Sequence, residues 1–374
     1  MIYLDNAAAA PPSKNVIDHF ASVAFELFPN QEAIHSAGYA VRKKLDQISK
    51  NFAGLIDSKN KSSVFWVNSG TEGLNCVFAH PFFAKGNIVT TLSEHAALLE
   101  SVKSFKETEV RIVNLRADGQ IDTDHFLSLL DENTTAIAIH HVQSETGVIQ
   151  DLVSLRILID GKAPKAKFVV DTVQAIGKVY IPWNEARIDF CFIAGHKIGC
   201  PSGGAVVYRD TAKIFSTYFT MIRSERHAVS RPEPSAVSTL NFALEDVITN
   251  FSINQQNAEA LNDQLRTGLA SIKLPAGSVT LSVATKKASP YIIHCTIPGF
   301  QAAVLLRFLA AAKVMVSSGS ACEAETKEPS RALTAMGFDK AKAYSGLRIS
   351  LWTQTTKEDI KTLLSALQQA INDY

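Results

Sequence analysis

The 374-residue chain has almost no net charge, because 37 basic residues are balanced by 36 acidic ones. Binding to nucleic acid or to an anionic membrane surface depends on an excess of positive charge, so this balance argues against both partners. No stretch reaches the roughly 18 apolar residues that a membrane-spanning helix needs. The first basic residue, Lys14, follows Asp5 and two prolines instead of leading an apolar run, which is unlike a secretory signal.

Cysteine is also scarce. The five cysteines are an odd number and none has CxxC spacing, which argues against a disulfide framework and against a zinc site. Together with the missing leader, this predicts a cytoplasmic protein in a reducing compartment. The length and the 46% of hydrophobic residues suffice for a large soluble enzyme of two linked domains.

Apolar runs rich in β-formers alternate with helical patterns through the first two thirds of the chain. This alternation predicts an α/β fold whose mostly parallel sheet carries active residues at its carboxyl edge. A single long helix is expected from Asn241 to Ile272, followed by a strand near 291–297 and a helix over 301–312. We expect residues 15–252 to form the large domain, and 1–14 with 253–374 to form a smaller α/β domain. The expected strands of the large domain are 64–67, 88–91, 110–115, 136–140, 168–171, 190–194 and 204–208.

Lys197 follows one of these buried strands, in the sequence Gly195-His196-Lys197. A lysine at such a position can lose its proton by desolvation, and its amine then becomes a nucleophile that forms a Schiff base with a carbonyl cofactor. The alternative is an ordinary solvated lysine.

Asp171 ends the preceding strand, one strand–helix spacing upstream. Pyridoxal phosphate (PLP) needs a lysine for its aldehyde and an acid for its pyridine nitrogen, and two strand ends here supply that pair. Taken alone, Asp171 is also typical of a helix N-cap. The pair favours PLP.

Residues 69–73, with the sequence SGTEG, follow a strand and open a helix. The backbone N–H groups at such a helix start, with the Thr71 hydroxyl, make a natural phosphate site. The alternative explanation is a simple Ser/Thr N-cap.

Seven short motifs in order resemble the NifS/IscS-like (group I) cysteine desulfurases of the class V aminotransferase family. They are YLDNAA at 3–8, SGTE at 69–72, SEH at 93–95, HVQSETGV at 141–148, VD at 170–171, GHK at 195–197 and SSGSAC at 317–322. The resemblance implies the PLP-dependent transferase fold type I, with a seven-stranded, mostly parallel sheet in the large domain. It also implies a homodimer.

The resemblance implies a cofactor site made by Lys197, Asp171, Gln174, His95, Gly70, Thr71 and His196. In it, His95 stacks on the pyridoxal ring and handles protons, and Gln174 donates to the phenolic oxygen. Gly70, Thr71 and His196 lie on the phosphate side. Lys197 carries the cofactor and moves the proton at the substrate Cα, so both Lys197 and His95 are predicted catalytic residues.

Two further residues are implied for the substrate, L-cysteine. Arg348 lies on an apolar strand and can grip a carboxylate with two parallel bonds, although an edge-strand arginine can also pair with a surface acid. Cys322 is surrounded by small residues, so we expect an exposed thiol that attacks the substrate sulfur, leaving a persulfide and alanine. A buried structural cysteine is the alternative, and that is our interpretation of the other four cysteines. A sulfur-acceptor protein follows from the persulfide.

Several positions depart from the family pattern. Gln143 and Ser144 replace two asparagines, the second of which binds the phenolic oxygen and the substrate, so Ser144 occupies a substrate-binding position. Ala194 replaces a serine, and Pro234 lies where a phosphate-binding threonine is expected; each change removes a hydrogen-bond donor. The tail by which housekeeping members dock the iron–sulfur scaffold is not found before Tyr374, so the sequence does not indicate the acceptor.

These departures keep two other functions open. One is a related PLP-dependent lyase or aminotransferase acting on another amino acid, such as selenocysteine. Ser144 suggests this alternative. The other is a non-catalytic scaffold protein whose cofactor site has decayed. Ala194 and Pro234 suggest this alternative. The joint retention of Lys197, Asp171 and the other site residues favours the desulfurase.

Overall fold

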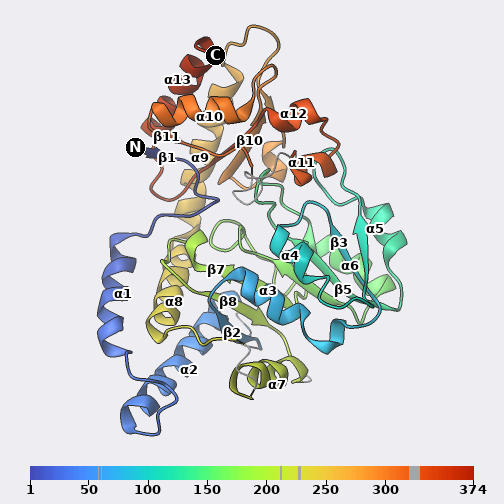
Figure 1. The fold of residues 1–374 in the computed structure, drawn as a ribbon, viewed down its shortest axis with the longest axis vertical. Coiled ribbons are helices and arrows are strands. Elements are labelled where there is room, and N and C mark those ends of the chain that lie inside the picture. Colours follow the sequence, from blue (N-terminus) through green and yellow to red (C-terminus); the bar gives the residue numbers. More distant parts are fainter. Residues whose placement is uncertain (58, 60, 211–212, 226–228, 320–328) are drawn as a thin grey trace.

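The computed structural model describes residues 1–374 except 58, 60, 211–212, 226–228 and 320–328 (Figure 1). A seven-stranded sheet forms its centre, in the order β2-β8-β7-β6-β5-β3-β4. Only β8 runs opposite to its neighbours, so the predicted mostly parallel seven-stranded sheet is confirmed. The strands are β2 (Ser63–Val67), β3 (Asn87–Thr91), β4 (Glu109–Val113), β5 (Thr134–His140), β6 (Lys167–Asp171), β7 (Phe190–Ala194) and β8 (Gly204–Tyr208).

Helices cover both faces of this sheet, which is why its central strands are continuous apolar runs. All five residues of β7 are buried, and they alternate between two hydrophobic clusters. Phe190 and Phe192 face the cluster built with α3 (Gly70–Phe78), α4 (Ala96–Ser101) and α7 (Ile214–Thr220). Cys191 and Ile193 face the larger cluster, which includes α1 (Lys14–Glu26), α2 (Ser36–Ile56), α5 (Thr123–Leu129), α6 (Leu152–Lys162) and α8 (Pro234–Thr249).

The C-terminal part contains a second, antiparallel sheet in the order β12-β10-β9. The first residues of the chain join this part, because β1 (Ile2–Tyr3) pairs in parallel with β11 (Val314–Met315) (Figure 1). No helix of the described residues is both long and apolar enough to cross a membrane. The remaining elements are β9 (Thr280–Leu281), β10 (Ile292–Thr296), β12 (Gly346–Ser350), α9 (Phe251–Ala270), α10 (Ala302–Ala311), α11 (Arg331–Ala335), α12 (Lys340–Tyr344) and α13 (Lys357–Asn372).

The expected single helix from Asn241 to Ile272 is wrong in two respects. Helical structure begins earlier, at Pro234, where the missing N–H of proline costs nothing because the first N–H groups of a helix have no partner within it. It is also interrupted at Asn250, whose side-chain amide donates to the carbonyl of Asp246 at 2.9 Å and competes with the backbone ladder. Helix α8 contacts α1 and α2, whereas α9 contacts α13. The division of the chain near Ser252 stays a prediction.

Candidate active site

A cavity of about 310 Å³ lies where the carboxyl ends of β5, β6 and β7 meet the N-terminal turn and β12. Ligand sites in open parallel sheets are expected at this edge. Nine of the ten predicted site residues line it: Lys197, Asp171, Gln174, His95, Gly70, Thr71, His196, Arg348 and Ser144. The structure thus brings together side chains that are up to 278 positions apart, from Gly70 to Arg348.

Lys197 closes a single 3-10 turn, Gly195–Lys197, directly after β7. A side chain at Gly195 would place its Cβ 2.7 Å from the carbonyl oxygen of Ser202, so only glycine permits this turn. The amine of Lys197 donates to the carbonyl oxygens of Ala7 and Ala8, each at 2.7 Å. Lys197 is therefore not the solvated lysine of the alternative explanation, since its amine is held inside the cavity wall.

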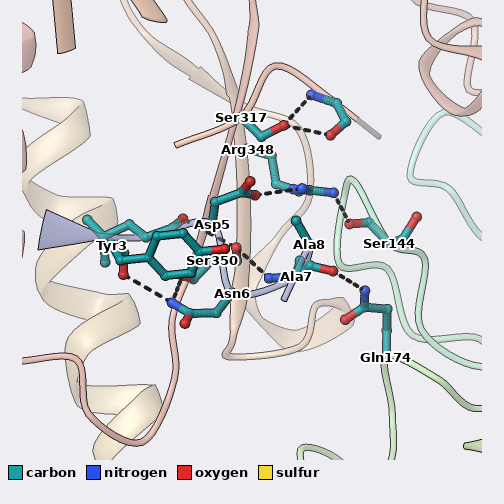
Figure 2. Close-up of polar contacts among 12 residues, drawn as sticks. Tyr3, Asp5, Asn6, Ala7, Ala8, Ser144, Gln174, Ser317, Arg348 and Ser350 are labelled. Carbon is teal, nitrogen blue, oxygen red and sulfur yellow. Dashed lines mark hydrogen bonds and ion pairs between the residues drawn. The ribbon is translucent and has the colours of Figure 1, made fainter. Parts of the chain in front are cut away.

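The turn that accepts from Lys197 is itself fixed by the end of β12 (Figure 2). The N–H of Ala7 donates to Ser350 Oγ at 2.8 Å, and the side-chain amide of Asn6 donates to the Ser350 carbonyl at 2.7 Å. Residues of the small sheet therefore determine where the carbonyls of Ala7 and Ala8 lie.

Asp171 is the last residue of β6, and one of its carboxyl oxygens accepts from the backbone N–H of Val173 at 2.9 Å. Burial raises the pKa of this carboxyl, and the hydrogen bond from Val173 and the imidazole of His95 oppose the effect in part. A carboxyl in this state gains most from a cationic partner that restores its charge. The turn-forming contact expected of an N-cap is present, but it leaves the second oxygen for such a partner.

A buried histidine beside Asp171 lines the cavity and is close to a buried glutamate. His140 is opposite Asp171 in the β5–β6 register, and its Nδ1 lies 2.9 Å from the Glu94 carboxylate. Glu94 also accepts from the Thr91 hydroxyl at 2.8 Å. Thr91 therefore holds the Glu94 carboxylate beside the His140 ring.

Gln174 lines the cavity, is almost fully buried and points toward Ala7 (Figure 2). Its amide nitrogen donates to the Ala7 carbonyl at 2.8 Å, and its oxygen accepts from Lys178 at 3.2 Å. Both hydrogen bonds place the amide nitrogen of Gln174 toward Ala7 and its oxygen toward Lys178.

The start of α3 forms the end of the cavity expected to hold a phosphate. Ser69 caps this nine-residue helix by accepting from the N–H of Glu72 at 3.1 Å, so the N-cap explanation is correct for Ser69. A Cβ at Gly70 would lie 3.3 Å from Val173 and 3.7 Å from Ala194, so glycine keeps this end of the cavity open. The positive end of the helix dipole adds to the attraction for an anion.

Arg348 is 2% exposed, and it is oriented by two partners (Figure 2). Its Nη2 donates to Asp5 at 2.7 Å, and its Nη1 donates to the backbone carbonyl of Ser144 at 3.2 Å. Both the substrate role and the alternative of pairing with an acid were considered from the sequence. The acid is present, and its contact orients a guanidinium that itself lines the cavity.

Cys322 lies outside the described residues. The chain that leads to it is described as far as Gly319, and Ser317 exchanges two backbone hydrogen bonds with Arg348, at 3.1 and 2.7 Å. The described chain that precedes Cys322 therefore lies beside β12 at Arg348 (Figure 2). The other four cysteines are buried, as predicted, and burial raises the pKa of each thiol, to about 11 or 12: Cys76, Cys191, Cys200 and Cys295.

Of the departures from the family pattern, Ser144 and Ala194 line the cavity and Pro234 does not. Ala194 lines the cavity itself, so the missing hydroxyl is lost from the site. Pro234 is buried as the first residue of α8, outside the cavity lining.

Sequence reasoning missed the roles of four residues at this site: Asp5, Glu94, His140 and Lys178. Asp5 and Glu94 stood inside recognised motifs but had no assigned partner. His140 ends a strand next to Asp171 in the sheet, so the alignment of strand ends was the signal that pointed to it. Nothing in the local sequence distinguishes Lys178 from a surface lysine.

The residues present fit PLP. The donor set consists of one lysine amine, one buried carboxyl, one amide donor and one helix N-terminus, which match the aldehyde, pyridine nitrogen, phenolic oxygen and phosphate of the cofactor. The glycine at the helix start leaves room for the phosphate. Among the described residues, no cluster of three or more His, Cys, Asp or Glu side chains forms a metal site.

Comparisons with known proteins agree with this geometry. The mitochondrial cysteine desulfurase of Eremothecium gossypii is 27% identical, with 99% of this chain and 76% of that protein covered. Cysteine desulfurase NifS of Azotobacter vinelandii is 26% identical over 97% of this chain and 90% of that protein. The solved structure of a NifS-like protein from Rickettsia africae superposes over the full length of both chains, with a TM-score of 0.85 and 25% identity. The profile of the family described as "Aminotransferase class-V" matches residues 2–363, and the chain belongs to this family.

Proposed function

We propose that this protein is a PLP-dependent cysteine desulfurase that converts L-cysteine to L-alanine and carries the sulfur as a persulfide on Cys322. The observation that carries the proposal is the convergence of Lys197, Asp171, Gln174 and Arg348 on one cavity. An amine, an acid, an amide donor and a guanidinium are together what a PLP enzyme acting on an amino acid requires. The similarity to cysteine desulfurases supports the choice of cysteine among amino acids.

Bound PLP would supply an aldehyde that condenses with amines and a ring that accepts electron density from the substrate Cα. Asp171 would pair with the pyridine nitrogen and keep it protonated, which also relieves the cost of its own buried charge. Gln174 would donate to the phenolic oxygen. Gly70 and Thr71, with His196 nearby, would bind the phosphate at the start of α3, and His95 would cover the ring.

Arg348 orients the substrate by its carboxylate. Asp5 and the Ser144 carbonyl each hold one nitrogen of the guanidinium, so its direction is set before the substrate arrives. Lys197 is the general base that moves the proton at Cα, and the Ala7 and Ala8 carbonyls hold its amine just after the end of β7.

Cys322 takes the sulfur. Its thiolate attacks the substrate sulfur, the C–S bond of cysteine breaks, and an S–S bond forms on Cys322. The electron pair of the C–S bond stays with the carbon, which gains a proton and becomes the methyl group of alanine. A thiol acceptor on another protein would then remove the sulfur.

The proposal is tested by adding PLP to the purified protein and recording its visible absorption band, then adding L-cysteine with a reductant. Wild type is expected to show the band, to respond to cysteine and to form alanine. Cys322→Ala should keep the band and lose nearly all alanine formation. If the band appears and cysteine gives no alanine, while selenocysteine or another amino acid is turned over, then that amino acid is the substrate in place of cysteine. No band at all would favour the scaffold protein.

A homodimer is part of the proposal. Four large apolar side chains are exposed at the end of α1, in the segment that joins α1 to α2 and at the start of α2, at the opposite end of the molecule from α13 (Figure 1). Their exposed fractions are 85% for Phe25, 80% for Phe28, 101% for Ile34 and 62% for Tyr39. Such a patch is typical of an interaction surface, and a second copy of the chain is the commonest partner of a soluble enzyme.

The patch adjoins the phosphate end of the cavity. Glu32 in this segment pairs with Arg231, and the neighbouring Ser230 accepts from the Asn68 side chain at 2.8 Å, two residues before Gly70. A second copy bound at this surface would therefore lie close to the start of α3. This position supports a dimer whose partner borders the cofactor site.

Sedimentation of wild type and Phe28→Asp tests the dimer. Wild type should sediment as a dimer and Phe28→Asp should dissociate, because a charge placed in an apolar interface is left unpaired. Ile157→Asp is the matched control, since Ile157 is 66% exposed on α6, away from the patch. A monomeric wild type, or equal dissociation of both variants, contradicts the proposal. A cytoplasmic location remains a prediction of composition alone.

A further inference from the structure

Lys178 is a fully buried lysine that the proposed reaction does not use. It lies one residue after Gly177, in the turns that follow Asp171. Its Nζ donates to Gln174 Oε1 at 3.2 Å and stands 5.3 Å from the centre of the Trp352 ring. Among the residues that the structure describes, no carboxylate pairs with it.

A buried cation without an acid is expensive, so its position calls for a physical reason. The neighbouring charges make the cost larger, since burial, Lys197 and Arg348 together lower the pKa of Lys178 to about 7. An apolar side chain of similar length would pack against Trp352 without this cost. Stability of the fold therefore does not explain the lysine.

The contacts of Lys178 form one continuous chain of hydrogen bonds that ends at Lys197. Lys178 donates to the oxygen of Gln174, and the nitrogen of Gln174 donates to the Ala7 carbonyl at 2.8 Å. The same carbonyl accepts from Lys197 at 2.7 Å. The side-chain amide of Gln174 thus links Lys178 to the Ala7 carbonyl, which in turn orients Lys197.

The chemistry of lysine gives this chain a fixed direction. Lys178 donates to the oxygen of Gln174, and this contact leaves the amide nitrogen for the side of Ala7 and the cavity. Without Lys178, the Gln174 oxygen would be buried without a donor, and the amide would gain from rotating away. A rotated amide would no longer present its N–H groups to the site.

We propose that Lys178 is a positioning residue of the cofactor site, which fixes the amide of Gln174 and, through Gln174, the Ala7 carbonyl that orients Lys197. The inference rests on the proposed function, because the orientation of Gln174 matters only in a protein that binds PLP at Lys197. It adds a residue from the loop after β6 to the groups that determine cofactor affinity.

Lys178→Met tests this role, because methionine fills a similar volume without a donor. The dissociation constant of PLP and the position of its visible band are measured by titration, and thermal unfolding is measured without cofactor. The expected result is about tenfold weaker PLP binding with a shifted band. The unfolding temperature should be unchanged or higher, since a buried charge has been removed. Lys165→Met, at an exposed position, is the control and should match wild type.

A double-mutant cycle shows whether the effect passes through Gln174. In a Gln174→Ala background, Lys178→Met is expected to cause no further loss of PLP affinity. Additive losses would overturn the inference, and so would unchanged affinity and band in Lys178→Met. A fall in unfolding temperature that accompanies the loss would show a structural role instead. If Lys178→Met does not fold, Lys178→Gln tests the same chain, because a glutamine at 178 permits both orientations of Gln174. Failure of the proposed function is distinguished by wild type, which would then show no PLP band.

Discussion

Replacing Arg348 by lysine should weaken substrate binding while leaving the chemical step nearly unchanged. The guanidinium keeps one nitrogen on Asp5 and one on the Ser144 carbonyl, and its planar fork still offers parallel N–H groups to a carboxylate. A lysine has one nitrogen, which cannot serve Asp5 and the substrate equally. Losing one charge-assisted hydrogen bond costs about 1.5 to 3 kcal/mol. This energy corresponds to a KM for L-cysteine that is about 10 to 150 times higher.

Steady-state alanine formation over a range of cysteine concentrations separates KM from kcat. We expect kcat to fall much less than KM rises, because the carboxylate is held equally in the ground state and the transition state. Arg307→Lys, on the exposed face of α10, is the matched control and should change neither constant. If Arg348→Lys binds PLP normally and its KM stays within threefold of wild type, Arg348 does not hold the substrate carboxylate.

Three further changes have expected outcomes. Gly177 and Gly277 both have left-handed backbones, with φ of +69° and +76°, but of the two only Gly177 has a neighbour with which a Cβ would collide, at 2.6 Å. Gly277→Ala should cost about 1 to 2 kcal/mol of unfolding free energy, and Gly177→Ala should cost about 1 to 3 kcal/mol more. Equal losses of the two variants in urea unfolding would contradict the packing argument. Burial lowers the pKa of His141 to about 4 and that of His294 to about 3, so the folded protein keeps both imidazoles neutral while the unfolded chain binds protons below its higher pKa. The stability that they contribute is present above about pH 6.5 and falls as the pH is lowered, by about 2 kcal/mol per imidazole at pH 5. His294→Gln should therefore lose less unfolding free energy than wild type between pH 7 and pH 5. The same dependence of unfolding free energy on pH in both proteins would refute the assignment. Ala194→Ser returns a hydroxyl to the cavity wall and should tighten PLP binding about threefold to tenfold, whereas unchanged or weaker binding in a titration would show that the phosphate does not approach this position.

Much of the architecture was predictable, because the central strands are nearly continuous apolar runs between helical patterns. The parallel sheet and the strand ends that carry Asp171 and Lys197 follow from that alternation and from the rule that such ends share one edge. The break at Asn250 was not predictable from apolar periodicity. Neither a proline nor a glycine marks the boundary between α8 and α9 at this residue.

The contacts that complete the site could not be predicted from the sequence, for a different reason. Asp5 and Arg348 are 343 positions apart, and Lys178 differs from a surface lysine only through the three-dimensional packing of Trp352 over it. A motif names the groups that react with a ligand, because their chemistry is specific. It is silent on the groups that orient them, since any donor at the right place would serve.

The pairing of β1 with β11, and of the turn at Ala7 with Ser350, has a consequence for the newly made protein. During synthesis, the ribosome releases the seven strands of the central sheet, with Lys197 among them, long before it releases β12. Residues 2–8 leave first and must wait for partners more than 300 positions behind them. Joining such distant segments is slow in folding. The nascent chain therefore holds Lys197 in a cavity that lacks one wall, and this wall is added only when the last sixth of the chain has been made.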